Sequence, residues 1–403
     1  MDAQLSTQTP AKTLVFTGAI ALAIAMGIGR FAFTPLMPLM LRDGTLDAAT
    51  GTEWAAANYL GYLLGALTAS WFARNPLQGL RLGLMGVVLT TVGIAWVDAS
   101  VAWTGAVLRG GAGVCSAWVL VCASSWCLPA LARAGSAALG GWVYTGVGLG
   151  IAVTGVMAWL GGNQSTLLLW IELGVLAAAG TGYVLRSLSL QAAPAAAQQP
   201  VHSSAHRSTA APADQGNLGV VLCYATFGFG YIVPATFLPT MARQLVSDPL
   251  VFGLTWPIFG TAAALSVAFA ARCLSDWPRR KVWAVAQAVM ALGTLLPLLH
   301  QAVWVLAASA VLVGGTFMVA TMAGLQLGRE QMPANPTPLL ARMTAGFATG
   351  QIAGPLLVRL MGSHHWAGWD ALDLANALAT LLLAATSFWL WQGRNAPAAK
   401  PQH

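Results

Sequence analysis

Residues 14–41, L-V-F-T-G-A-I-A-L-A-I-A-M-G-I-G-R-F-A-F-T-P-L-M-P-L-M-L, decide the fold class because this long apolar run contains a single charged residue, Arg30. A helix of roughly 20 residues crosses the hydrocarbon core of a bilayer, which is about 30 Å thick. The run is too long for the core of a signal peptide, and no clear cleavage site follows it. We therefore expect it to be a membrane-spanning helix that stays in the mature protein.

The rest of the chain has the same character. It is 57% hydrophobic and 8% charged, whereas a soluble domain carries roughly 25% charged residues. The short alternating segments of a membrane β-barrel are not seen. We predict an all-α polytopic membrane protein with twelve transmembrane helices, over residues 14–41, 53–73, 80–97, 101–127, 136–160, 166–185, 217–241, 250–273, 281–299, 302–327, 338–361 and 372–391.

The chain divides into two similar halves. Residues 187–216 are rich in Ala, Pro, Gln and Ser, a composition that buries too little apolar surface to become ordered. They are predicted to be a flexible cytoplasmic linker between an N-terminal six-helix bundle, 1–186, and a C-terminal one, 217–403. Offsets of 200–204 relate residues of the two halves, among them the pairs Gly27/Gly228, Gly29/Gly230, Pro38/Pro239, Trp54/Trp256 and Gly146/Gly346. Such a duplicated bundle is typical of transporters that alternate access by rocking one half against the other.

Basic residues indicate the orientation. Of the nineteen Lys and Arg residues, fourteen fall on one predicted side, three on the other, and Arg30 and Arg109 lie within helices. This bias favours cytoplasmic N- and C-termini. The net charge of +7 does not indicate nucleic acid, because the basic residues lie at the ends of apolar runs. The five cysteines fall in apolar segments without metal-ligand spacing, so we expect no metal and no cofactor.

A family resemblance adds to this interpretation. The segments Gly27-Ile-Gly-Arg-Phe-Ala-Phe-Thr-Pro-Leu-Met-Pro38, Ala57-Asn-Tyr-Leu-Gly-Tyr-Leu-Leu-Gly-Ala66, Tyr144-Thr-Gly-Val-Gly-Leu-Gly-Ile151 and Gly350-Gln-Ile-Ala-Gly-Pro355 resemble those of the major facilitator superfamily, and within it the YbfB/YjiJ group of bacterial transporters. The resemblance implies the major facilitator fold and the bacterial inner membrane. It does not imply a particular cargo.

Wider superfamily motifs match unevenly. Leu274-Ser-Asp-Trp-Pro-Arg-Arg280 resembles the cytoplasmic gating motif, which makes Asp276 and Arg280 the candidate gating residues. Its counterpart in the first half, Arg74-Asn-Pro-Leu-Gln-Gly-Leu-Arg81, has no Asp. The segment Arg109-Gly-Gly-Ala-Gly113 is similar to the Arg motif of proton-coupled exporters, but Ala112 stands where Gln is usual.

Three ionisable residues lie inside predicted helices, where a charge costs on the order of 3 kcal/mol. Arg30 and Arg109 are positive and Glu172 is negative. Arg30 is a candidate clamp for a substrate carboxylate, or alternatively a buried Arg satisfied by backbone carbonyls freed around Gly29. Arg109 is a second candidate for substrate or proton coupling, or a structural partner of Glu172. Glu172 is the leading proton-coupling candidate, or alternatively an interfacial residue near a helix end.

Aromatic and amide side chains complete the candidate binding set. They are Asn58, Tyr59, Tyr62, Tyr144, Tyr231, Trp256 and Gln351. A mostly apolar pocket with a few placed polar groups is the usual form of a ligand site. Helix packing with hydrogen bonds across helices is an equally good account of any one of these residues.

The predicted function is secondary active transport of a small molecule, coupled to protons, with an organic anion as the preferred cargo. The transporter is expected to be a monomer. One alternative is multidrug efflux of cationic or neutral compounds, for which Glu172 would be the binding charge. A membrane-embedded enzyme would need a nucleophile–base pair or a carboxylate cluster, and neither is found in the predicted spans, so we do not expect an enzyme. A sensor without turnover is the third alternative.

Overall fold

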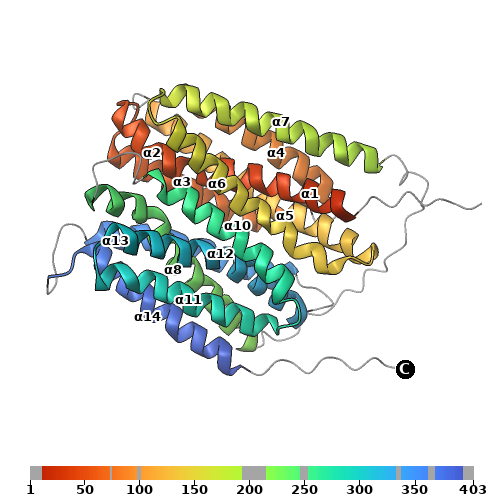
Figure 1. The fold of residues 1–403 in the computed structure, drawn as a ribbon. Coiled ribbons are helices and arrows are strands. Elements are labelled where there is room, and N and C mark those ends of the chain that lie inside the picture. Colours follow the sequence, from red (N-terminus) through yellow and green to blue (C-terminus); the bar gives the residue numbers. More distant parts are fainter. Residues whose placement is uncertain are drawn as a thin grey trace, which may run out of the picture.

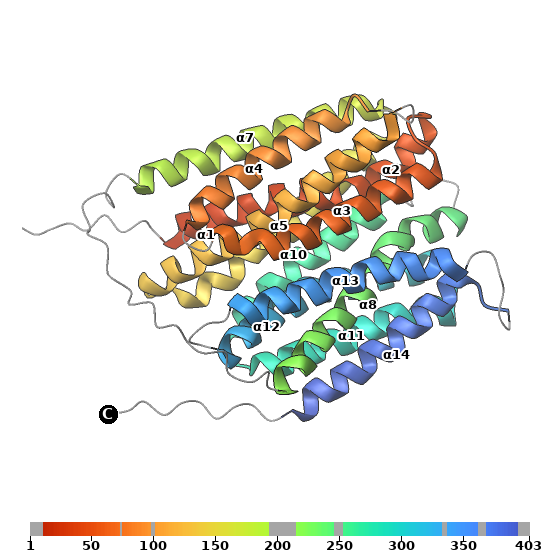
Figure 2. The same ribbon diagram turned by 180° about the vertical axis from the view of Figure 1, so that it is seen from behind.

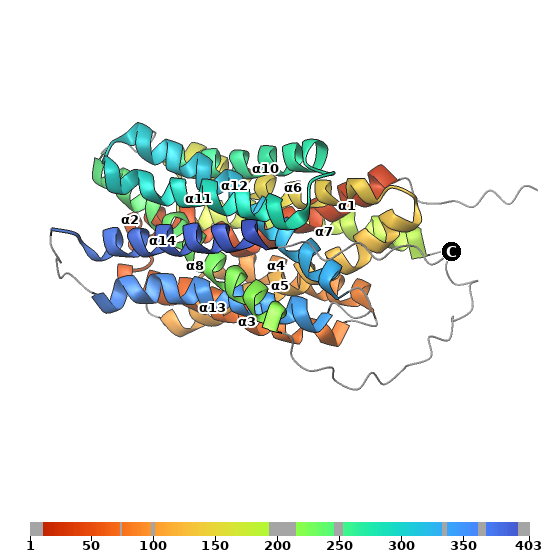
Figure 3. The ribbon, with the colours of Figure 1, turned by 90° about the horizontal axis from the view of Figure 1, so that it is seen from below.

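A computed structural model describes residues 11–72, 75–97, 101–192, 215–245, 253–332, 337–361 and 368–393. Its helices run along one common direction and form a single elongated bundle (Figures 1 and 3). The N-terminal helices form one side of this bundle and the C-terminal helices form the other (Figures 1 and 2). The start of α1 (Ala11–Leu22) and the end of α14 (Ala371–Gln392) lie at the same end (Figure 1).

The first half begins with three consecutive segments that together form one candidate membrane span, Ala11–Arg42, where one helix was predicted over residues 14–41. They are α1, the π-helical segment η1 (Ala23–Phe31) and α2 (Phe33–Arg42). The remaining elements of this half are α3 (Ala48–Thr68), η2 (Ala69–Phe72), α4 (Pro76–Ile94), α5 (Ala102–Arg133), the 3-10 segment η4 (Ala137–Tyr144), α6 (Thr145–Leu160) and α7 (Thr166–Ala192).

The second half has six helices in the described residues. They are α8 (Gln215–Leu245), α10 (Thr255–Cys273), α11 (Arg279–Leu299), α12 (Val303–Gln331), α13 (Thr337–Met361) and α14. Because α7 continues to Ala192 and buries Leu188, the first residues of the predicted linker are helical. The rest of that linker, up to residue 214, lies outside the described residues.

Ten of the spans in the described part of the chain are long and apolar enough to cross a membrane. The predicted count of twelve is therefore not confirmed. Helices α3 and α13 run alongside the others (Figure 2) but are not among the ten. Each carries polar residues within its length, including Asn58 in α3 and Gln351 in α13. The pseudo-symmetry of the halves also stays a prediction.

Small residues bring the two halves together where α6 packs against α10. Gly148 faces the backbone of Ala264, Gly155 faces Pro257, and Gly260 faces the backbone of Ala152. In every pair the two residue numbers add to 412, and such a constant sum is expected for two antiparallel helices in one register. Gly141 in η4 extends the same register to Ala271. We call these residues the small-residue seam. It permits close backbone approach along α6 and α10, as small residues do between membrane helices.

Candidate functional site

The first helix changes from α-helical to π-helical over residues 23–31. The π-helical turns of η1 widen the backbone spiral, as such segments often do at functional sites. Gly27 lies against the backbone of Gly150 in α6, where a Cβ atom would collide. Gly29 leaves room for Ser116, whose Oγ would lie 2.7 Å from an added Cβ. Close packing therefore requires glycine at both of these positions in η1.

Arg109 in α5 binds the carbonyl groups of η1. Its Nη1 donates to the Gly29 carbonyl at 3.1 Å, and its Nη2 donates to the Arg30 carbonyl at 3.0 Å. Its guanidinium carbon lies 4.8 Å from the centre of the Phe33 ring. The Arg109 carbonyl accepts from Asn58 Nδ2 at 2.9 Å, which attaches α3 to α5. The carbonyl-bound role that was considered for Arg30 thus belongs to Arg109.

Glu172 makes no ion pair with either arginine in the described residues. It is half-buried in α7, a helix on the outer side of the N-terminal half (Figure 1). In the described residues the ion pairs are Arg42–Asp43 and Arg279–Glu330. The pairing considered between Glu172 and Arg109 is therefore not formed, because backbone carbonyls bind the Arg109 guanidinium instead.

Arg30 is held differently from Arg109. Its side chain is buried, with 3% of its surface exposed. Its guanidinium carbon lies 3.6 Å from the centre of the Tyr62 ring, 5.3 Å from that of Phe31 and 6.0 Å from that of Tyr59. Its Nη2 donates to Gln351 Oε1. The Nε and Nη1 atoms are buried without a hydrogen-bond partner in the described residues.

The desolvation of Arg30 is thus offset incompletely. A buried cation over an aromatic ring gains about 2 kcal/mol, and a charged group left without its hydrogen-bond partners in a protein interior costs more than a neutral one. Nε carries one N–H group and Nη1 carries two, so three donors of a permanently charged group remain to be satisfied. An anion could accept from some of them.

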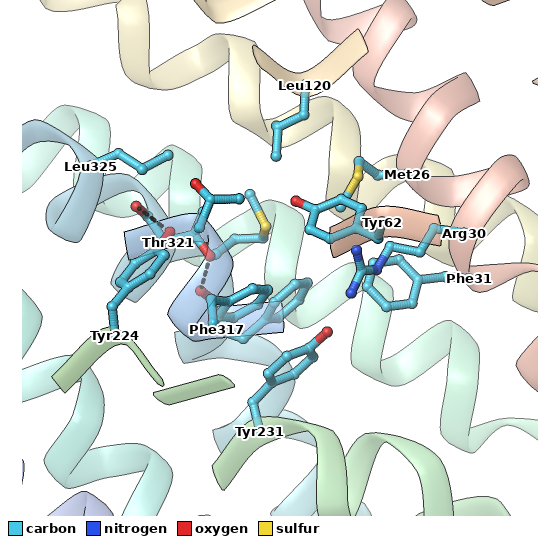
Figure 4. Close-up of a pocket in the computed structure, with 13 residues that line it drawn as sticks. Met26, Arg30, Phe31, Tyr62, Leu120, Tyr224, Tyr231, Phe317, Thr321 and Leu325 are labelled. Atoms are coloured by element: carbon cyan, nitrogen blue, oxygen red, sulfur yellow. Dashed lines mark hydrogen bonds between the residues drawn. The ribbon is translucent and has the colours of Figure 1, made fainter. Parts of the chain in front are cut away.

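A cavity of about 30 Å³ lies beside Arg30. This exceeds the roughly 10–15 Å³ that one water molecule needs and is far below the roughly 300–1,000 Å³ of ligand pockets. In Figure 4 Arg30, Phe31 and Tyr62 face the cavity from one side and Tyr231 from another, with the Tyr231 hydroxyl directed toward the Arg30 guanidinium. Of the thirteen described lining residues, Arg30 is the one with a charged side chain; the set is Met26, Arg30, Phe31, Tyr62, Leu120, Tyr224, Tyr231, Phe317, Met318, Thr321, Leu325, Thr344 and Phe347.

Both halves therefore contribute to the cavity. Tyr231 in α8 stacks on Phe317 in α12, with ring centres 5.3 Å apart, and on Phe347 in α13 at 5.5 Å. The Tyr231 hydroxyl accepts from Gln351 Nε2. Phe31 of the first half meets Phe317 of the second edge to face at 6.2 Å. The result is an aromatic chamber with one cationic group at its wall.

The structure brings together four of the predicted binding residues. Arg30, Tyr62, Tyr231 and Gln351 form one contact group, with Tyr59 at its edge. Trp256 lies next to this group, since it stacks on Phe259 at 5.3 Å and meets Phe31 at 6.4 Å.

Two other predicted residues have packing contacts away from the cavity. Tyr144 shares a hydrogen bond of 2.9 Å with Ser124 inside the first half, and Asn58 binds the Arg109 carbonyl. Neither is among the lining residues.

The predicted gating residues contact their own half. Arg280 Nε donates to the Leu390 carbonyl at 3.0 Å, and its guanidinium carbon lies 4.4 Å from the centre of the Trp389 ring, both in α14. Asp276 accepts from Ser275 Oγ at 3.3 Å. In the described residues these two side chains make no ion pair with each other or with the first half.

Sequence reasoning missed Phe317 and Phe347, the rings that enclose Tyr231. Phe347 precedes Gln351 by four residues, so both lie on one face of α13, and that spacing could have identified it. No comparable signal was available for Phe317, whose position depends on the packing of α12 against α8.

Comparison with known proteins extends these observations. No curated protein matches the chain. A family model described as "Uncharacterised MFS-type transporter YbfB" matches residues 22–388, which include every element from η1 to α13 and most of α14. By this match, the chain belongs to the YbfB family of major facilitator transporters.

Proposed function

We propose that the protein is a secondary active transporter of small organic anions that works by alternating access, with Arg30 as the group that binds the anion. The observation that supports this most is the state of Arg30. It is buried at the contact between the two halves, and two of its guanidinium nitrogens have no partner in the described residues. A carboxylate would supply charge and acceptors together, and hydrogen bonds between charged groups are roughly twice as strong as neutral ones.

Cation efflux has less support. A cationic substrate would need a negative group in the chamber, and the described lining residues contain none. It would also have to approach Arg30 against like-charge repulsion. Glu172, the negative group that this alternative requires, is on α7 rather than at the cavity.

For coupling, we propose that protons drive transport and that Glu172 is the titrating group. It lies six residues inside α7, or about 9 Å along the helix axis at about 1.5 Å per residue. An ionisable residue at such a depth is a functional candidate by default. The proposal also includes a monomer in the bacterial inner membrane with both termini in the cytoplasm, for which the basic residues at the helix ends are the support.

The experiment is transport by purified protein in liposomes. A thermal-shift screen over organic anions first identifies a ligand, whose radiolabelled form is then followed under an imposed proton gradient. We expect Arg30→Ala to abolish uptake and Arg30→Lys to retain a small part of it. Arg133→Ala, at an exposed residue near the end of α5, is the control and should behave like wild type. Uptake at the wild-type rate by Arg30→Ala would refute the role of Arg30.

Coupling is tested separately from binding. Glu172→Gln should remove the response to the proton gradient and leave exchange of labelled for unlabelled substrate intact. A Glu172→Gln variant that still concentrates substrate under the gradient would exclude Glu172 as the coupling group. The binding role of Arg30 would be unaffected by that result.

A further inference from the structure

A chain of polar contacts crosses between the halves beside the cavity. Arg30 Nη2, in the first half, donates to Gln351 Oε1, and Gln351 Nε2 donates to the Tyr231 hydroxyl, both in the second half. Gln351 is fully buried, and Tyr231 is 1% exposed. We call these three residues the central link. Near the cavity the two bundles also meet through aromatic rings, since Phe31 contacts Trp256 and Phe317.

The geometry of a guanidinium group decides what the central link does to an anion. The flat group offers two edges on which a carboxylate can form two parallel hydrogen bonds. One edge consists of Nε and Nη2, and the other of Nη1 and Nη2. Both edges include Nη2, whose two N–H groups are directed one to each edge. Gln351 accepts from Nη2 and therefore occupies one of these two edges. The two free nitrogens of Arg30, Nε and Nη1, do not share an edge.

We infer that Gln351 is a displaceable substitute for the substrate's carboxylate, and that an anion which binds the Arg30 edge used by Gln351 must break the central link. This role rests on the proposed function, because it needs an anion at Arg30. Replacement of Gln351 by the anion should strengthen the hydrogen bond, because a charged acceptor replaces a neutral amide oxygen on the same donor. Gln351 keeps its contact to Tyr231, which stays stacked between Phe317 and Phe347.

The size of the cavity leads to the same conclusion. A space of about 30 Å³ is far below the roughly 300–1,000 Å³ of ligand pockets, so the halves must lie further apart when a substrate is bound. Loss of the central link removes the polar contact that opposes this separation at the centre. Binding of the anion and movement of the halves are thereby coupled through one side chain.

The test uses Gln351→Leu, which cannot accept from Arg30, and Gln351→Glu, which places a permanent carboxylate on Arg30. Gln287→Leu is the matched control. Gln287 is also fully buried in the second half, but its Nε2 donates to Thr386 within that half at 2.7 Å. Wild-type thermal stability of the control and of at least one Gln351 variant establishes that folding is retained.

The first measurement needs no ligand. Spin labels on exposed residues at one pair of adjoining ends of α3 and α13, at Leu67 and Arg342, report the separation of the halves. Labels at Ala56 and Leu360 report the opposite ends of these helices. We expect Gln351→Leu to shift one of these distance distributions to longer values, and Gln351→Glu and Gln287→Leu to retain the wild-type distribution. Wild-type distances in Gln351→Leu would overturn the role of the central link.

The second measurement is the affinity for benzoate, with benzamide as its uncharged analogue. Benzoate is the probe because the cavity wall is aromatic and its one charge is positive. Removal of the competing acceptor should tighten benzoate binding by Gln351→Leu about threefold to tenfold, the equivalent of one hydrogen bond. Gln351→Glu should lose benzoate binding. Weaker benzoate binding by Gln351→Leu would show that Gln351 is an ordinary substrate contact and would overturn the inference. Absence of benzoate binding by both wild type and Gln351→Leu would count against the proposed anion class, while the spin-label distances still decide the role of the link.

Discussion

Arg30 and Arg109 show how one residue type has two roles a few ångströms apart. Both are buried, and both have an aromatic ring beside the guanidinium. Arg109 donates two hydrogen bonds to backbone carbonyls of η1. Arg30 has a displaceable amide on one nitrogen and no described partner on two others. Arg109 therefore positions the segment that carries Arg30, and Arg30 faces the chamber.

This difference predicts a large effect on stability at Arg109. Arg109→Ala should lower the free energy of unfolding by about 1–3 kcal/mol, because two buried carbonyls lose their donors. Denaturant unfolding in mixed micelles measures this loss. Arg133→Ala should change the stability by less than about 0.5 kcal/mol, as is usual for exposed residues. Equal stability of the two variants would show that the η1 carbonyls do not depend on Arg109.

At the end of the bundle opposite the termini, Asp43 predicts a dependence of stability on pH. Burial raises the pKa of the Asp43 carboxyl, but hydrogen bonds from Thr166 and Arg42 outweigh it, so the pKa lies below the ordinary value of 3.8. The Thr166 amide donates to Asp43 Oδ2 at 2.8 Å, which attaches α2 to the start of α7. The ionised carboxylate therefore stabilises the folded state above the unfolded pKa, and this contribution is lost as pH falls through the lower folded pKa.

The measurement is thermal unfolding between about pH 6 and pH 3. Wild type should lose stability as the pH falls through this range, and Asp43→Asn should begin less stable and lose less. A parallel decline of the two proteins would assign the acid sensitivity to other carboxylates.

At the scale of the element, the π-helical part of the first span is what the sequence predicted least well. A single span over residues 14–41 follows from hydropathy, but the π-helical turns of η1 follow from contacts with other helices. Gly27 meets Gly150, and Arg109 takes the carbonyls of Gly29 and Arg30. Hydropathy reports whether a segment prefers lipid, and carries no information about which distant donor will bind a freed carbonyl.

The tight packing of η1 predicts a strong response to a single methyl group. Gly27→Ala should destabilise the protein by about 1–3 kcal/mol through overpacking against the Gly150 backbone. Gly182→Ala in α7 is the matched control, because a Cβ there meets no atom within 4 Å. It should be neutral or stabilising by up to about 1 kcal/mol, the difference in helix propensity between Gly and Ala. Denaturant unfolding of both variants provides the comparison, and similar losses in the two would contradict the close packing of η1.

The candidate site was predictable in part for the same reason. A charged residue in an apolar run is visible in the sequence, so Arg30 was identified. Its partner Gln351 was selected as a cavity residue, but the contact spans 321 positions in the chain and no local pattern encodes it. The choice between binding and packing for Tyr144 and Asn58 likewise depended on neighbours in other helices, Ser124 and Arg109.

For the whole molecule, the small-residue seam between α6 and α10 predicts that the halves resist any added bulk at their contact. In Gly148→Ala the new Cβ would lie 2.7 Å from the Ala264 Cα, so the halves would have to move apart. We expect this variant to lose most of its transport rate while it retains the thermal stability of a folded protein. Transport of the identified anion in liposomes is the measurement.

Gly315→Ala is the control for this variant. Its added Cβ would meet Ala262 and Ser266 at 3.9 Å, an ordinary contact distance. Transport by Gly315→Ala should match wild type. A Gly148→Ala variant that transports equally well would mean that α6 and α10 separate freely.

The seam also bears on the speed of the carrier. Where backbone lies against backbone, few long side chains interdigitate, and a tilt of one half therefore requires few rotamer changes along this line. The activation barrier for reorientation should then arise mainly at the centre, where aromatic rings and one amide must part. The turnover rate would then be limited by the separation of side chains at the cavity. The long contact between α6 and α10 would contribute little to the barrier.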